Sequence, residues 1–170
     1  MTNASGSFPI RLFVAAVLIM GVLIGCQSMP IEEKRLRTIA VWDLENLNQT
    51  DSMALDLGEL LANKVIEALS ESGKWNVVER EQLIVALEEL NLGATSMVSD
   101  STRLKIGKIV GAHYMVFGHY MQMMQMMQLN LRLVDVATGQ ILKSAQRSTF
   151  DKDIGKWLEV AKAAAMDLQI

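Results

Sequence analysis

The stretch Leu129-Asn130-Leu131-Arg132-Leu133-Val134 decides the fold class, because apolar and polar side chains alternate along most of its length. Successive side chains of a β-strand point to opposite faces, so this alternation predicts a strand with one buried face. Ala137-Thr138-Gly139 follows closely and is typical of a hairpin turn. We therefore expect residues 140–150 to form a second strand that returns antiparallel to the first.

A third strand is predicted just upstream, over residues 114–121, and it completes an antiparallel meander of three strands. The N-terminal half of the chain has a different pattern. Thr38-Ile39-Ala40-Val41-Trp42 is apolar enough for a central strand, and residues 75–78 form another short apolar run. Apolar residues between them recur at helical spacing from Leu57 to Leu69, which predicts a parallel strand–helix–strand unit with a right-handed crossover.

Further helices are expected over residues 80–90, from Ser99 or Asp100 to Val110, and over 156–170. Residues 43–50 carry no apolar period and are predicted to form a loop, with Asp51 or Ser52 as the N-cap of the helix that follows. The fold class is therefore α/β, with a mixed sheet of a parallel unit and an antiparallel meander, flanked by about four helices.

The first residues of the chain indicate its compartment. Arg11 precedes an apolar run over residues 12–24, which has the length of a secretory signal and is short for a transmembrane helix. Leu23-Ile24-Gly25-Cys26 then matches the bacterial lipobox, in which the cysteine is lipidated and becomes the first residue of the mature protein. Cys26 is the only cysteine, so a disulfide has no partner within the chain.

We therefore predict a signal peptide over residues 1–25, a lipid-anchored tether over 26–37 and a periplasmic domain over 38–170. Acyl chains on Cys26 anchor the protein in a membrane, because each buried CH₂ group contributes about 0.8 kcal/mol. Gln27, rather than an aspartate, follows the cysteine, and by resemblance to known sorting behaviour this favours the outer membrane.

A methionine-rich tract lies between the first two strands of the meander, with five methionines among seven residues. A hairpin that turns near Met124 and Gln125 is expected to place Met121, Met123 and Met127 on or near the packing face. Packing is the first interpretation because methionine fills irregular gaps. A partner-contact surface is one alternative, and a Cu(I) site is the other because thioethers suit that ion. The copper candidates are His119, Met121, Met123, Met124, Met126 and Met127, although strand alternation divides their sulfur atoms between two faces.

Other chemistry finds little support in the sequence. The only histidines are His113 and His119, and no serine, histidine and aspartate have the spacing of a catalytic set. Gly107-Lys108 lacks the glycine loop of a phosphate site. The net charge is −3, and no lysine and arginine cluster follows one face, which argues against a nucleic-acid partner. We expect no enzyme activity, no cofactor and no metal.

Three stretches resemble blocks of the curli production assembly/transport family, the CsgG/HfaB type of outer-membrane lipoprotein. They are Trp75–Leu83 (WNVVEREQL), Ile109–Tyr120 (IVGAHYMVFGHY) and Leu131–Ile141 (LRLVDVATGQI). The lipobox is a fourth match, and the resemblance covers nearly the whole mature chain. It implies a lipid-anchored domain that acts in export or assembly of curli-like fibres or another surface polymer, with export-system proteins as partners and possible homo-oligomers.

One departure from that family concerns the pore. A membrane-spanning strand needs about 9–11 residues, and the segment between Met121 and Leu129 is too short for a pore-forming hairpin. The resemblance therefore implies an oligomeric or accessory subunit rather than a pore. The alternative function is a lipoprotein module that binds an envelope partner, such as a cell-wall synthase or a flagellar component, without a transport role.

Overall fold

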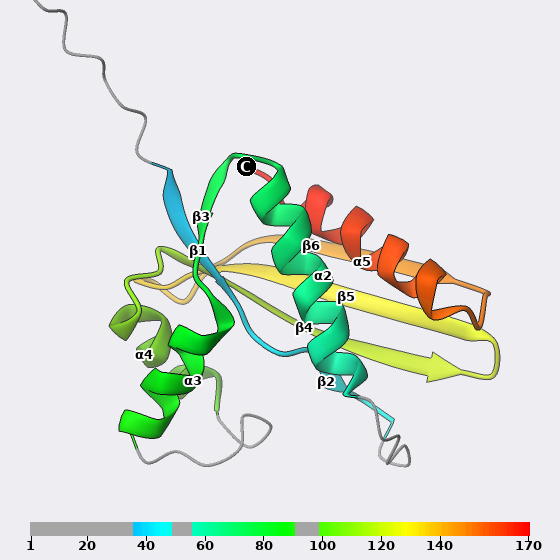
Figure 1. Cartoon of the computed structure of the whole chain (residues 1–170), viewed down its shortest axis with the longest axis horizontal. Helices are drawn as coiled ribbons and strands as arrows, with labels where there is room; N and C mark the ends of the chain where they lie inside the picture. Colours follow the sequence, from blue (N-terminus) through cyan, green and yellow to red (C-terminus); the bar gives the residue numbers. More distant parts are fainter. Residues whose placement is uncertain (1–35, 49–55, 91–98) are drawn as a thin grey trace, which may run out of the picture. The chain divides into compact units, whose positions relative to one another are not determined.

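The computed structural model describes residues 36–48, 56–90 and 99–170 (Figure 1), and every structural statement below concerns these residues. The chain divides into two units, Met1–Lys34 and Arg35–Ile170, and all described residues belong to the second. The expected signal peptide and Cys26 therefore lie outside the described part of the chain. No described helix is long and apolar enough to cross a membrane.

A single mixed sheet forms the centre of the domain (Figure 1). β1 runs parallel to both β3 and β4, whereas β4, β5 and β6 are successively antiparallel. The strands in spatial order are β3 (Trp75–Val77), β1 (Arg37–Val41), β4 (Tyr114–Met123), β5 (Met126–Asp135) and β6 (Ile141–Thr149). The predicted fold class is confirmed, including the parallel unit and the antiparallel meander.

The expected loop after β1 contains one further short strand. β2 (Glu45–Asn46) pairs in parallel with His119 and Tyr120 of β4. The loop prediction was wrong at this point, because two polar residues carry no apolar pattern that reveals a strand. The pairing extends the sheet along β4, beyond the end of β1.

Four helices flank the sheet: α2 (Leu57–Glu71), α3 (Arg80–Glu89), α4 (Asp100–Ile109) and α5 (Ile154–Asp167). α2 begins later than expected, because Asp56, rather than Asp51 or Ser52, is its N-cap. The carboxylate of Asp56 accepts a hydrogen bond from the backbone N–H of Glu59 at 3.0 Å, which satisfies one free donor of the first turn.

The two faces of the sheet carry separate hydrophobic cores. α2 and α5 lie side by side over one face (Figure 1), where they bury Leu129, Leu131 and Leu133 of β5. α3 and α4 pack on the opposite face near the start of β4, against Met115 and Phe117. Farther along that second face, toward the end of the β4–β5 hairpin, the side chains are half-buried or exposed.

The hairpin turns at Met124 and Gln125, as expected, but its faces differ from the prediction. Met123 pairs with Met126, and Gln122 pairs with Met127. Met127 therefore lies in the core beneath α2 and α5, whereas Met121 and Met123 point to the opposite face. The expectation that these two also join the packing face was wrong, because a two-residue turn fixes the register and places them with Met126 instead.

Candidate functional site

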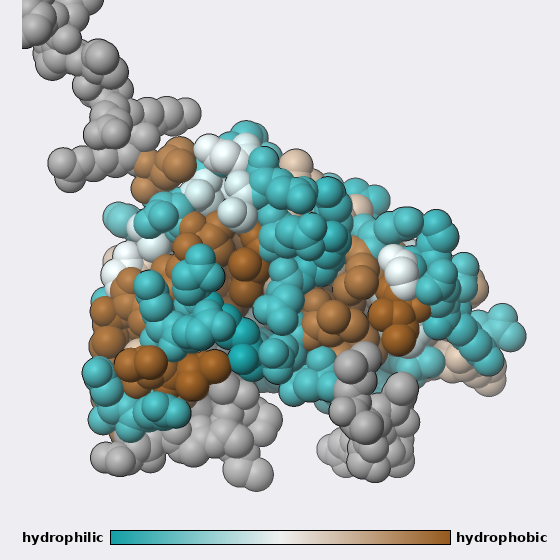
Figure 2. Space-filling view, viewed as in Figure 1, coloured by the Kyte–Doolittle hydropathy of each residue, from teal (hydrophilic) through white to brown (hydrophobic). Residues whose placement is uncertain are grey.

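The two most exposed large apolar side chains of the described residues lie at the turn of the β4–β5 hairpin and just after β6. Met124 is 95% exposed and Phe150 is 78% exposed, while Leu47 and Met123 are each about half exposed. We call this group the hairpin-end surface, and it comprises Leu47, Met121, Met123, Met124, Met126 and Phe150. Figure 2 views the molecule from the side of α2 and α5, where the hairpin end is mostly hydrophilic with a paler brown area at its lower edge.

Strand pairing places the members of the hairpin-end surface at the same end of the sheet. Leu47 continues the register of β2 and lies beside Met121, since its backbone N–H donates to the carbonyl oxygen of Tyr120 at 3.0 Å. Asn48 fixes this segment further, because its side chain exchanges two hydrogen bonds with the backbone of Gln122. Phe150 directly follows Thr149, which pairs with Met127 on the other side of β5.

The structure also locates the copper candidates. His119, Met121, Met123 and Met126 share one face of the sheet, Met127 is fully buried on the other face, and Met124 occupies the turn. The predicted division of the sulfur atoms between two faces is therefore confirmed. Among the described residues, no three His, Cys, Asp or Glu side chains form a group that could hold a metal ion.

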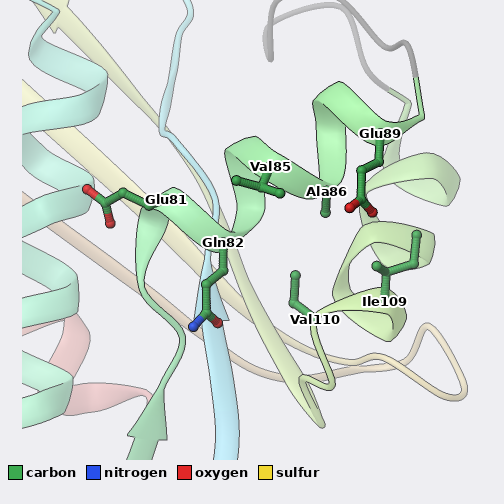
Figure 3. Close-up of a pocket in the computed structure, with 7 residues that line it drawn as sticks. All are labelled: Glu81, Gln82, Val85, Ala86, Glu89, Ile109 and Val110. Carbon is green, nitrogen blue, oxygen red and sulfur yellow. The ribbon is translucent and has the colours of Figure 1, made fainter.

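A separate feature is an apolar concavity between α3 and the end of α4 (Figure 3). It has a volume of about 320 Å³, and its two most exposed apolar side chains, Val85 and Ile109, are each 53% exposed. The lining residues are Glu81, Gln82, Val85, Ala86, Glu89, Ile109 and Val110. We call it the α3–α4 groove; sequence periodicity missed it because Val85 and Ile109 lie outside the buried faces of their helices.

Two arginines fasten α3 and α4 to the loop that follows β1. Arg80 donates to both carboxylate oxygens of Asp43, at 3.0 and 2.9 Å, and lies 3.3 Å from Glu59. The hydrogen bond to Asp43 raises the pKa of Arg80 above its ordinary value. These charges are paired with one another, so they connect α3 to α2 and to the loop after β1.

Arg103 makes the equivalent connection from α4. Its side chain is almost fully buried, pairs with Glu45 and lies 5.5 Å from the centre of the Trp42 ring. A guanidinium over an indole ring is attracted by the negative face of the aromatic system. Arg103 thereby supports β2, which carries Leu47 of the hairpin-end surface.

Comparisons with known proteins identify the family. The family model described as "Peptidoglycan-synthase activator LpoB" matches residues 26–148. A penicillin-binding protein activator LpoB from Klebsiella pneumoniae is 29% identical over 104 residues, which cover 61% of this chain and 48% of that protein. The chain spans about half the length, or less, of the curated relatives it matches.

Solved structures support the same fold. The LpoB C-terminal domain from Salmonella enterica has a TM-score of 0.56 at 23% identity, covering 66% of this chain and 82% of that domain. The lipoprotein GNA1162 from Neisseria meningitidis has a TM-score of 0.58 at 15% identity, covering 74% and 91% of the two chains. At these identities the likeness establishes the fold alone.

These findings correct the expected family and function. The assignment to the CsgG/HfaB curli family was wrong, because the LpoB model matches most of the chain. The expected role in export or assembly of fibres rested on that assignment and was therefore also wrong. The blocks that suggested the curli family are ordinary strand, turn and helix-end patterns, which in this chain form β3, β4 and the turn between β5 and β6. A protein partner within the cell envelope agrees with the new family, whereas an export apparatus does not.

The expected localisation is confirmed, since the LpoB homologues are outer-membrane lipoproteins with a periplasmic domain. Lipidation of Cys26 stays a prediction, because that residue lies outside the described part of the chain. With a family model that covers residues 26–148, the chain belongs to the peptidoglycan-synthase activator LpoB family.

Proposed function

We propose that the protein activates a cell-wall synthase of the penicillin-binding protein class from its position at the outer membrane. The match of residues 26–148 to the synthase-activator family carries this proposal. The curated relatives support it, since each is named as a penicillin-binding protein activator. The activity needs no reaction on the chain itself: the domain binds the synthase and favours its active conformation.

Binding alone can activate an enzyme when the ligand prefers one of two conformations. A ligand shifts such an equilibrium only by its difference in affinity for the two states. The proposed activator therefore has to contact a part of the synthase that changes during activation. An exposed apolar surface on a folded domain is suited to this kind of contact.

Reconstitution with purified components tests the proposal. The mature chain without its lipid, residues 27–170, is added to each penicillin-binding protein of the source organism together with a lipid-linked peptidoglycan precursor. We expect glycan polymerisation or cross-linking by one synthase to accelerate, with half-maximal effect at the measured Kd of the complex. Absence of both binding and acceleration for every synthase would overturn the proposed function.

A further inference from the structure

We propose that the synthase binds this domain by adding a strand to its sheet, through an extended, acidic segment that pairs with the free edge of β6. The inference rests on the function proposed above and names the contact through which the synthase is held. The backbone groups that carry the pairing belong to Ser144, Gln146 and Ser148, and Lys143 selects for an acidic side chain.

The free edge is the first observation. β6 has β5 on one side and no described strand on the other (Figure 1). It is nine residues long, whereas β3 at the opposite border of the sheet has three. From Ile141 to Ser148 every residue except Ala145 is exposed. A long exposed border strand presents a row of N–H and C=O groups that another strand can bind, so β6 has room for one.

The register of the meander shows which backbone groups of β6 point outward. Met123 and Met126 flank a two-residue turn, so they form a hydrogen-bonded pair, and such pairs alternate along an antiparallel ladder. The odd-numbered residues of β5 therefore turn their N–H and C=O groups toward β6. Because Leu131 pairs with Ala145, the even-numbered residues of β6 point theirs outward. These residues are Ser144, Gln146 and Ser148.

Two further observations agree with this assignment. The N–H of Asp135, an odd-numbered residue of β5, donates to the carbonyl oxygen of Gln140 at 2.9 Å. Within the described part of the chain, the N–H groups of Ser144, Gln146 and Ser148 donate to no acceptor. Solvent or a partner strand has to supply their hydrogen bonds.

The charges of β6 are held over one face of the strand. Lys143 donates to the carbonyl oxygen of Gln169, and Arg147 donates to both carboxylate oxygens of Asp167, at 2.7 and 2.9 Å. Asp167 ends α5, which packs over β6, and Gln169 follows it. Border strands commonly use lysines and prolines to block pairing with another chain. Here the two cations are tied to the end of α5, and the outward backbone groups carry only serine and glutamine side chains.

Charge identifies the kind of segment that fits. Lys143 contacts a neutral carbonyl and no carboxylate of the described residues, whereas Arg147 is paired with Asp167. Pairs of opposite charge across neighbouring strands stabilise a sheet. A partner strand with an acidic side chain across from Lys143 therefore complements the edge.

A second copy of this chain fits the edge less well. In an antiparallel pairing of two β6 strands, only the register centred on Gln146 pairs all three outward residues, with Ser144 opposite Ser148. That register places the two Arg147 side chains diagonally across one face, within reach of each other, and brings a second unpaired Lys143 to the edge. Like charges weaken such a pairing, so the occupant is an acidic segment of the synthase.

Two substitutions at one position test the backbone contact. Gln146→Pro removes an outward N–H and leaves the ladder to β5 intact, because border strands tolerate proline where the N–H faces away from the neighbouring strand. Gln146→Ala is the matched control, since it removes the side chain and keeps the N–H. Both are measured against the purified cognate penicillin-binding protein in detergent, after circular dichroism confirms that each variant is folded.

We expect Gln146→Pro to bind at least about tenfold more weakly and Gln146→Ala to stay within about twofold of the unchanged chain. Unchanged binding by Gln146→Pro, or an equal loss in Gln146→Ala, would overturn the strand addition and leave the proposed function intact. Failure of the unchanged chain to bind any synthase would overturn both.

Charge reversal tests the acidic segment. Lys143→Glu should weaken binding by about three- to tenfold, since it replaces an attraction with a repulsion. Lys105→Glu on α4 is the control, because it makes the same change of net charge at an exposed position on a helix over the other face of the sheet. Equal effects of the two reversals would overturn the acidic character of the segment.

Amide hydrogen exchange needs no substitution, and it decides the matter if Gln146→Pro does not fold. The N–H groups of Ser144, Gln146 and Ser148 should exchange rapidly in the free chain and slowly in the complex, whereas those of Ala145 and Arg147 should be slow in both. Rapid exchange of all three in the complex would overturn the inference. A dimer by native mass that protects them without the synthase would show that a second copy occupies the edge, and the inference would be wrong.

Discussion

Met123 and Met126 pair directly across β4 and β5, with Met124 and Gln125 as the whole of the turn between them. This pairing determines the face of the sheet to which Met121 and Met127 point, whereas Met124 lies in the turn. Met127 enters the core beneath α2 and α5, and Met121 joins Met123 and Met126 on the opposite face. One tract thus serves two purposes, because alternate side chains stabilise the fold and leave an apolar surface at the hairpin end.

The strain at the tip predicts that Met124→Gly stabilises the protein. Relief of a positive φ at a non-glycine residue is worth about 1 kcal/mol, so the free energy of unfolding should rise by up to that amount. Denaturant unfolding of the unchanged chain and of Met124→Gly measures this difference.

Gln125→Gly is the matched control for that experiment. Gln125 occupies the other turn position, and its φ is not positive. Glycine there only adds freedom to the unfolded chain and should cost about 0.5–1 kcal/mol. Equal effects of the two substitutions would contradict the proposed strain at Met124.

Two glycines should respond very differently to alanine. A methyl group on Gly58 would lie 2.2 Å from the backbone carbonyl oxygen of Leu44, which cannot move without displacing the segment before β2. We expect Gly58→Ala to lower the free energy of unfolding by about 2–3 kcal/mol. On Gly107 the nearest atom is the sulfur of Met115, the movable part of a flexible side chain.

Gly107→Ala is therefore the control, and it should stay within about 1 kcal/mol of the unchanged chain. Repacking of Met115 costs some stability, and the better helix propensity of alanine offsets part of it. Thermal and denaturant unfolding of both variants measure the difference. A Gly58→Ala protein as stable as Gly107→Ala would show that α2 packs less closely on Leu44 than the structure indicates.

The buried Arg103 should contribute through packing as much as through charge. We expect Arg103→Ala to cost about 2 kcal/mol, because it empties the space over Trp42 and leaves Glu45 without its partner. Arg103→Met should cost less, since methionine retains the apolar stem and removes an Nε atom that is buried without a hydrogen bond. Glu45→Gln should cost under about 1 kcal/mol, because the Glu45 side chain is 43% exposed.

The sequence predicted the elements better than their arrangement. Alternation in β5 and helical spacing in α2 depend on local burial, so they placed those elements within a few residues. The position of β1 between β3 and β4 depends on pairing between distant segments, and no local pattern records it. Only part of the hairpin-end surface could be predicted from the sequence. The methionine tract is a local pattern, whereas Leu47 and Phe150 come from segments at β2 and β6 that only strand pairing places at the same end of the sheet.

The ion pair between Glu71 of α2 and Lys162 of α5 predicts a dependence of stability on pH. The hydrogen bond from Lys162 lowers the pKa of Glu71 below 4.5, and Glu71 raises the pKa of Lys162 above 10.5. Because the folded carboxylate has the lower pKa, its contribution is complete above its unfolded pKa and is lost as pH falls through the folded value. The contribution of Lys162 is lost as pH rises through its folded pKa.

Glu71→Gln removes both effects. The difference in unfolding free energy between the unchanged chain and Glu71→Gln should be largest between these two pH ranges and should shrink outside them. High salt should also reduce the difference, since both side chains are about half exposed. A difference that stays constant from acidic to alkaline pH would show that the pair does not link α2 to α5 in solution.

The last prediction concerns attachment to the membrane. Cys26→Ala should leave the periplasmic domain folded and release it into the soluble fraction, because the acyl chains would then have no attachment site. Fractionation of cells that express each form, followed by a salt wash, measures the release, and a thermal unfolding curve of the released protein checks the fold.

The released Cys26→Ala domain also separates two requirements for activation of the synthase, which are attachment to the membrane and contact with the domain. A released domain that still accelerates the purified synthase but fails to support it in cells would show that the lipid supplies location and the domain supplies the contact. A Cys26→Ala protein that stays with the membrane after the salt wash would contradict lipidation of Cys26 as the means of attachment.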